Sequence, residues 1–149
     1  MLDYTEVSPC HNELKNRETL PYNEDLVNTE VSKESYHDEN EMIHYTIVNK
    51  ELNMSTGKII AQCNHGIMLI TLRDHDTENF QKWLNTAIKA VTLKGTEKEM
   101  VKLKELLPQS IMIIDKGFTE IPNGSKTILS LPVMSRKEAH QYVKKFRLL

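Results

Sequence analysis

The chain is poor in cysteine, in aromatic residues and in long apolar runs. Its two cysteines, Cys10 and Cys63, are too few for a disulfide framework and favour a reducing compartment. No stretch approaches the roughly 18 uninterrupted apolar residues of a membrane-spanning helix. The polar, acidic N-terminus does not resemble a secretory signal. These absences predict a cytoplasmic protein with no membrane partner.

What the sequence does contain is typical of a soluble globular protein. It has 149 residues, of which 39% are hydrophobic and 27% are charged, enough for one domain with a real core. The charge is unevenly spread. Residues 1–40 carry ten acidic and three basic side chains, a net charge of −7, whereas residues 41–149 carry eleven acidic and sixteen basic ones, a net charge of +5. A mildly basic domain can meet a phosphate backbone, although such a charge is common among soluble proteins.

The composition divides the chain into a leader and a domain. Residues 1–40 lack helical or strand periodicity and have too few apolar side chains to offset the entropy of ordering them. We therefore expect a flexible acidic leader over 1–40 and one folded domain over 41–149. The alternative is a short arm within 20–31 that docks on the domain or on a partner.

Apolar periodicity and capping signals predict the order β-α-α-β-α-β-β-α from residue 42 on. The expected strands cover 43–48, 90–93, 111–114 and 127–133, and the expected helices cover 56–73, 79–87, 97–107 and the segment after Ser135. The pattern predicts an α/β fold with three α/β/α layers and a four-stranded, mixed but mainly parallel sheet. The short link before the last strand favours an antiparallel direction for that strand. The apolar stripe of the first helix is wide, so we expect most of this helix to be buried.

Three polar residues share one face of the otherwise apolar first helix. Lys58, Gln62 and His65 are spaced by four and three residues. Lys58 lies in the first turn, where a cation opposes the helix dipole but, together with free backbone N–H groups, can bind an anion. The alternative is a solvated helix face on which the lysine has no role.

A second group of functional candidates follows the apolar run 111–114. Asp115 comes directly after this expected strand, and the carboxyl ends of parallel strands are where α/β sheets bind ligands. If the first strand runs in the same direction, Lys58 and Asp115 meet at one edge. Asp115 would then orient a water or accept its proton, and Lys58 would stabilise developing negative charge. The alternative for Asp115 is a carboxylate that caps a turn. The loop and strand that follow add hydroxyl groups and flexible backbone at Gly117, Thr119, Gly124, Ser125 and Thr127.

These residues belong to two segments that resemble one protein family. The segment V-N-K-E-L-N-M-S-T-G-K-I-I-A-Q-C-N-H, from Val48, is similar to the pattern V-R-x-D-L-x-M-x-x-G-K-x-A-A-Q-x-x-H-A of type 2 peptidyl-tRNA hydrolases. The segment D-K-G-F-T-E-I-P-N-G-S-K-T-I-L, from Asp115, is similar to the family pattern D-A-G-R-T-Q-I-x-x-G-S-x-T-V-L. The likeness covers about residues 42 to 149 and preserves the order and spacing of both segments.

The resemblance implies hydrolysis of the ester that joins a peptide to the terminal ribose of tRNA, by a homodimer that needs no metal or other cofactor. Matching the family positions implies four catalytic residues, Lys58, Asp115, Thr119 and Thr127. It also implies five substrate-binding residues, Gln62, His65, Gly117, Gly124 and Ser125. The partner that the resemblance implies is peptidyl-tRNA.

Departures from the family pattern keep other functions open. Asn49 and Phe118 stand where the family has arginines, so phosphate contacts near the site should be weaker. A non-catalytic module that binds tRNA or protein on the same scaffold is the main alternative. A metal-dependent hydrolase built on His65, Cys63 or residues 74–76 is a remote one, because no pair has the spacing of a zinc site.

Overall fold

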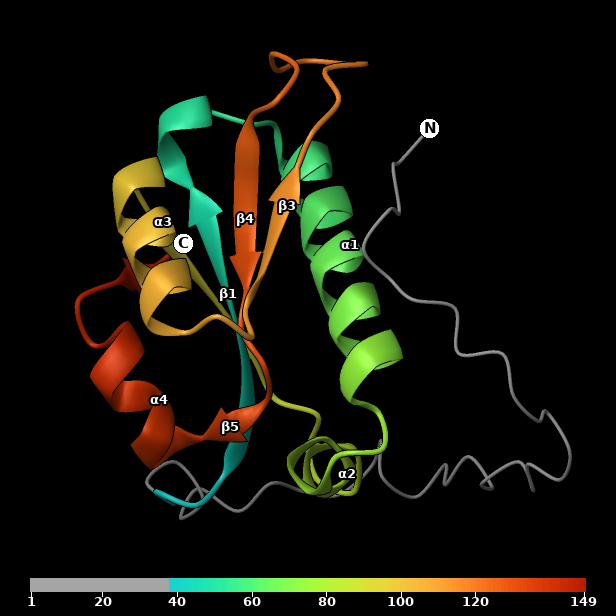
Figure 1. Ribbon diagram of the computed structural model, residues 1–149, viewed down its shortest axis with the longest axis vertical. Coiled ribbons are helices and arrows are strands. Elements are labelled where there is room, and N and C mark those ends of the chain that lie inside the picture. The colour runs from blue at the N-terminus through green and yellow to red at the C-terminus, as the bar shows by residue number, and fades with distance from the viewer. Residues whose placement is uncertain (1–37) are drawn as a thin grey trace, which may run out of the picture.

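The computed structural model describes residues 38–149, and the leader predicted over 1–40 lies almost wholly outside that range. The elements are β1 (Met42–Asn49), η3 (Lys50–Leu52), α1 (Thr56–Asp74), α2 (Glu78–Leu84), β2 (Ala90–Gly95), α3 (Glu97–Leu106), β3 (Ile111–Ile114), β4 (Lys126–Ser130), β5 (Met134–Ser135), α4 (Arg136–Val143) and β6 (Arg147–Leu148). Figure 1 shows a sheet flanked by helices, which confirms the α/β class. None of the described helices has the length and apolar character needed to cross a bilayer.

The sheet differs from the prediction in strand number and pairing. Its order is β3-β4-β1-β2-β6, with β5 paired to β1, so the expected count of four strands is wrong. The expectation of a mainly parallel sheet is also wrong, since only β1 and β2 pair in parallel. The added strands β5 and β6 have two residues each, too short to show any periodicity in the sequence.

The strand directions still place one edge where the sequence predicts it. β3 runs antiparallel to β4, and β4 runs antiparallel to β1, so β1, β2 and β3 all point the same way. The antiparallel direction of β4 confirms the expectation drawn from the short link before it. The carboxyl ends of β1, β2 and β3 therefore share one edge of the sheet, which is uppermost in Figure 1.

Local signals in the sequence set most helix starts. Ser55 caps α1 by accepting a hydrogen bond from Lys58 N, and Thr96 and Glu99 form a capping box at the start of α3. Two elements end earlier than predicted. Helix α2 stops at Leu84, and the link to β2 follows it, with Ile88 at a positive φ of 48°. Strand β4 stops at Ser130, two residues before Pro132, which has no N–H to donate to a ladder.

The side chains of β1 alternate between the two faces of the sheet and so contribute to two separate core clusters. Ile43, Tyr45 and Ile47 join a cluster with residues of α3 and α4, whereas Val48 joins a separate cluster with residues of α1 and β4. Helix α1 is less buried than its apolar stripe predicts. Its exposed apolar side chains are Ile60, Met68 and Leu72, at 56%, 59% and 68% exposure. A helix lying on a sheet buries only the strip that faces the strands, and here that strip is narrow.

Candidate active site

The candidate site lies where three segments meet at the carboxyl edge of the sheet. The first turn of α1 follows β1 through η3, and the loop of residues 115–125 joins β3 to β4. In Figure 1 this loop stands above the start of α1. Because β1 and β3 point the same way, residues more than fifty positions apart in the sequence come into contact here.

Lys58 and Asp115 form an ion pair at this edge. Lys58 Nζ donates to Asp115 Oδ2 and lies 3.1 Å from Thr119 Oγ1. The predicted contact between the helix lysine and the strand-end carboxylate is therefore observed. The two side chains are 12% and 10% exposed, so water can still reach the pair. The carboxylate also compensates for a cation that would otherwise oppose the helix dipole.

The Asp115 carboxylate is held by three donors on two elements. Besides Lys58, Gln62 Nε2 donates to Oδ2 at 3.0 Å, and the backbone N–H of Gly117 donates to Oδ1 at 2.7 Å. Burial alone would raise the pKa of this carboxyl. The hydrogen bonds from Lys58 and Gly117, the charge of Lys58 and the hydrogen bond from Gln62 outweigh that cost, so the pKa of Asp115 lies below its usual range. The group is an anion at neutral pH.

Gln62 connects Asp115 to a buried hydroxyl. Thr127 Oγ1 lies 2.7 Å from Gln62 Oε1 and 3.1 Å from the carbonyl oxygen of Ile113. Both partners are acceptors, so the single hydroxyl hydrogen is shared between them, and Gln62 Oε1 is the nearer of the two. Because the ionised Asp115 only accepts, the amide nitrogen of Gln62 must face the carboxylate, and its oxygen must face Thr127. Thr127 and Gln62 are buried, so the structure connects Thr127 to Asp115 only through Gln62.

The loop of residues 115–125 is held by its own backbone. Asp115 N donates to Ser125 O at 2.9 Å, and Gly124 N donates to Asp115 O at 2.8 Å. Gly117 has a φ of 74°, and a Cβ added to it would lie 2.5 Å from the backbone N of Asn123, so only glycine fits this position. Gly117, Gly124 and Ser125 therefore shape the loop that carries Thr119.

One contact at the site was not predicted from the sequence. The Glu120 carboxylate accepts from the backbone N–H of Ser55 at 2.8 Å and from its hydroxyl at 2.6 Å. These hydrogen bonds hold the pKa of Glu120 below its usual range. Glu120 thus ties the loop that carries Thr119 to the cap of the helix that carries Lys58. Its position next to Thr119, within the second family segment, was the signal available in the sequence.

Three residues singled out from the sequence lie apart from this cluster. His65 is an exposed residue of α1 and is not among the groups bonded to Asp115. Asn49 is buried, donates to the carbonyl oxygen of Lys126 at 2.9 Å and caps η3. Phe118 is 79% exposed beside Thr119. An arginine at position 118 would therefore reach solvent at the site, whereas position 49 points into the fold.

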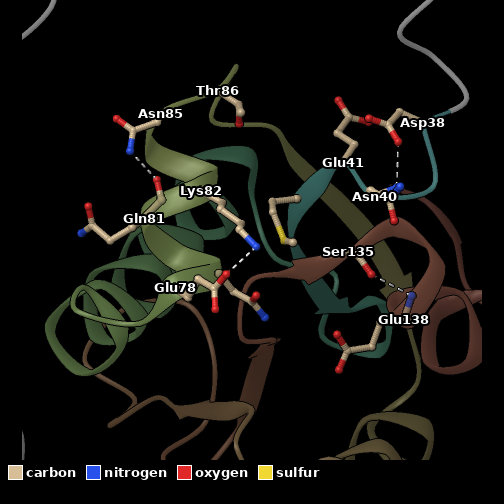
Figure 2. A pocket seen from close by; sticks show the side chains of 12 residues that line it. Asp38, Asn40, Glu41, Glu78, Gln81, Lys82, Asn85, Thr86, Ser135 and Glu138 are labelled. Atoms are coloured by element: carbon tan, nitrogen blue, oxygen red, sulfur yellow. Dashed lines mark hydrogen bonds and ion pairs between the residues drawn. The ribbon is translucent and has the colours of Figure 1, made fainter.

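Two cavities of the described domain lie away from this cluster. The cavity in Figure 2, of about 930 Å³, is lined by polar residues that include Glu41, Glu78, Lys82 and Glu138, at the opposite end of the sheet near α2 and β5. A neighbouring one, of about 720 Å³, is lined by residues of α1, α2 and the 106–109 segment. Neither contains Lys58 or Asp115.

The residues considered as metal ligands do not come together. Cys63 packs half-buried against an apolar cluster, where burial raises the pKa of its thiol. His75 Nε2 lies 2.9 Å from Asp76, and Asp74 is bonded by the Arg73 guanidinium. Within residues 38–149, no three His, Cys, Asp or Glu side chains are grouped so that they could hold a metal ion.

Fold and site together define an α/β protein with a lysine–carboxylate pair at the edge of its sheet, supported by an amide and two threonine hydroxyls. The family model described as peptidyl-tRNA hydrolase PTH2 matches residues 42–149, and the chain belongs to this family.

Similar curated proteins carry the same family name. A probable peptidyl-tRNA hydrolase 2 of Dictyostelium discoideum is 37% identical over 93 residues, which cover 57% of this chain and 44% of that protein. A peptidyl-tRNA hydrolase of Thermococcus onnurineus is 33% identical over 92 residues, covering 57% of this chain and 78% of that one. Peptidyl-tRNA hydrolase 2 of Saccharomyces cerevisiae is 32% identical over 100 residues, covering 57% and 47%. The matched part thus spans less than half of the Dictyostelium and Saccharomyces proteins.

Proposed function

We propose that this chain hydrolyses the ester bond between the peptide and the tRNA of peptidyl-tRNA, and so returns the tRNA for reuse. Family membership supports this reaction, and so do the names of the similar proteins. The observation that carries the proposal is the contact of Lys58 with both Asp115 and Thr119 at an accessible edge of the sheet.

The geometry favours a water as the attacking group. The oxygen of a water held by Asp115 adds to the ester carbonyl carbon, the bond from that carbon to the ribose oxygen breaks, and the ribose oxygen takes up the proton that the attacking water loses. A carboxylate with a lowered pKa is a weak base, so Asp115 serves mainly to orient the water and to hold Lys58. The Lys58 ammonium and the Thr119 hydroxyl would stabilise the negative charge that develops on the carbonyl oxygen.

The remaining predicted residues divide by position. Thr127 and Gln62 fit a positioning role, because their chain of hydrogen bonds sets the orientation of Asp115 without reaching solvent. Gly117, Gly124 and Ser125 keep the loop in shape beside the substrate. His65 stays a substrate-binding prediction on an exposed turn of α1.

Release of tRNA from an N-acetyl-aminoacyl-tRNA tests the proposal. Wild-type protein should release free tRNA, and Lys58→Ala and Asp115→Asn should each lose at least about a hundredfold in kcat/KM, since each removes electrostatic support for the transition state. Lys137→Ala, an exposed cation paired with Glu39, is the matched control and should behave like wild type. Absence of release by the wild-type protein would refute hydrolysis. Turnover abolished by Asp115→Asn would dispose of the alternative, a module that only binds tRNA.

Three further expectations belong to the same proposal. The separate clusters under α1 and under α3 support three α/β/α layers. The exposed apolar side chains of α1, Ile60, Met68 and Leu72, offer a surface on which a second copy would form a homodimer. The proposed role in translation favours the predicted cytoplasmic location.

A further inference from the structure

Cations without an ion pair gather near the candidate site. Within residues 38–149, salt bridges engage Arg73, Lys82, Lys89, Arg136 and Lys137 away from the carboxyl edge, and Lys58 and Lys126 at that edge. A second set of cations at that edge has no salt-bridge partner among the described residues. These cations are Lys50 after β1, Lys94 near the end of β2, Lys98 in the first turn of α3, Lys116 after β3 and Arg147 at the start of β6. The carboxyl edge of the described domain therefore carries several cations that have no salt bridge.

Two of these cations stand side by side on the sheet. Lys94 and Arg147 are register partners in β2 and β6, so their side chains lie on the same face. Lys94 is also the partner of Val48, whose side chain belongs to the cluster under α1. Lys94 and Arg147 are therefore on the α1 face of the sheet, and both are exposed.

Helix α1 leaves this part of the face uncovered. It packs chiefly on β3 and β4, while β2 and β6 lie at the other side of the sheet. Neighbouring strands are about 4.8 Å apart, so the step from β4 to β6 spans about 15 Å. A chain of phosphates that enters the site beside β3 and β4 can cross this distance over the open face.

The acidic groups nearby are engaged with other partners. Glu51 accepts from the backbone N–H of Glu97, Glu97 pairs with Lys126, and Glu99 is bonded within the capping box of α3. Their carboxylates are thus partly neutralised by groups other than Lys94 and Arg147. The charge of these two cations remains available to an anionic ligand.

We propose that Lys94 and Arg147 form a surface that binds the sugar–phosphate backbone of the tRNA beyond its acylated end. The proposal rests on the proposed function and adds a place for the body of the substrate. Phosphate contacts of this kind position an RNA without reading its sequence. They also make affinity fall with salt, because bound counterions are released.

The test compares Lys94→Gln/Arg147→Gln with a matched pair, Lys82→Gln/Lys137→Gln, whose side chains are exposed at the other end of the domain. The first double variant should bind deacylated tRNA on the order of tenfold more weakly near physiological salt, and its salt slope should be smaller by about 1 to 2. The control pair and the conservative variant Lys94→Arg/Arg147→Lys should bind like wild type.

A small substrate separates this surface from the catalytic site. An N-acetyl-aminoacyl ester of adenosine lacks the tRNA body, so its hydrolysis should be the same for wild type and Lys94→Gln/Arg147→Gln. Equal losses on the small ester and on the full tRNA, an unchanged salt slope or an equal loss in the control pair would each overturn the proposal. If the wild-type protein hydrolyses neither substrate but its tRNA binding still depends on Lys94 and Arg147, the proposed reaction is wrong and the surface stands.

Discussion

Gly66 in α1 and Ile128 in β4 fill one space between them. A Cβ added to Gly66 would lie 2.6 Å from Ile128 Cδ1 and 2.9 Å from Ser130 Cβ. The family pattern that this chain resembles has alanine at the position of Gly66 and valine at that of Ile128. The extra methyl group of Ile128 thus occupies the space that a shorter side chain would leave to an alanine on the helix, and the glycine lets α1 approach the sheet closely.

This relationship predicts a non-additive pair of substitutions. Gly66→Ala should destabilise the domain by about 1 to 3 kcal/mol through overpacking, and Ile128→Val by about 0.5 to 1.5 kcal/mol through a small cavity. The double variant should be more stable than the sum of the two effects predicts, because Ile128→Val removes the clash with Cδ1 and leaves only the contact with Ser130 to be relieved. Urea unfolding of the four proteins measures the coupling. Strict additivity would show that the methyl group added by Gly66→Ala and the Cδ1 of Ile128 do not compete for this space.

Buried His44 predicts an acid-sensitive fold. Its ring lies 2.8 Å from Ser130 Oγ, and burial lowers the pKa of its imidazole from 6.5 to about 4. The unfolded chain therefore takes up this proton first. Stability is fully present above pH 6.5 and is lost as the pH falls toward 4, by about 3 kcal/mol in total.

Fluorescence of Trp83, the single tryptophan, reports this effect, because its ring centroid lies 6.1 Å from that of His44. Urea unfolding at about pH 7.5 and about pH 5 should show a smaller drop in stability for His44→Gln than for wild type. His140→Gln, which changes an exposed histidine of α4, should retain the full drop. Equal drops in wild type and His44→Gln would contradict the assignment.

The chain of hydrogen bonds behind Asp115 predicts a shift in the pH profile. Replacing Gln62 by Met removes one donor from the carboxylate and leaves a buried residue of similar size. The pKa of Asp115 should rise, so the acid limb of kcat/KM for an N-acetyl-aminoacyl-tRNA should move to higher pH. Thr127→Val should move it in the same direction but less, since Thr127 acts through Gln62. Asn64→Ala, an exposed change on the same helix, is the control. If the acid limb of kcat/KM for Gln62→Met stays at the wild-type pH, Gln62 does not help to lower the pKa of Asp115.

The sequence predicts those parts of the molecule that depend on local signals. Ser55 and the pair Thr96–Glu99 are local caps, and β3 is a continuous apolar run, so their positions were predictable. The contact of Lys58 with Asp115 follows from strand direction, which the order of elements suggested. The pairing of β6 with β2 depends on backbone hydrogen bonds between residues far apart in the sequence, and no apolar periodicity in the sequence indicates it. The exposure of Met68 depends on how α1 lies on the sheet, which an apolar stripe alone does not determine.

The two family arginines that this chain lacks should differ in effect when restored. Phe118 is exposed beside Thr119, so Phe118→Arg should strengthen tRNA binding at low salt and steepen the salt slope by about 1. Asn49 is buried and bonded to Lys126 O, so Asn49→Arg should instead lower the thermal unfolding midpoint. Binding titrations over a salt series and thermal unfolding separate the two. An unchanged salt slope in Phe118→Arg would place this residue outside the path of the RNA.

Glu120 should set the position of Thr119 relative to Lys58. Its two carboxylate oxygens accept separately from the N–H and the hydroxyl of Ser55, whereas the glutamine of the family pattern has one acceptor oxygen. Glu120→Ala should lower kcat on an N-acetyl-aminoacyl-tRNA by about tenfold, because a loosened loop misplaces the hydroxyl, and Glu120→Gln should lie between this variant and wild type. Neither should change the affinity for deacylated tRNA. Glu105→Ala, an exposed change on α3, is the control. If Glu120→Ala keeps the wild-type kcat, the link to Ser55 does not position the site, and the loop is held by its backbone bonds alone.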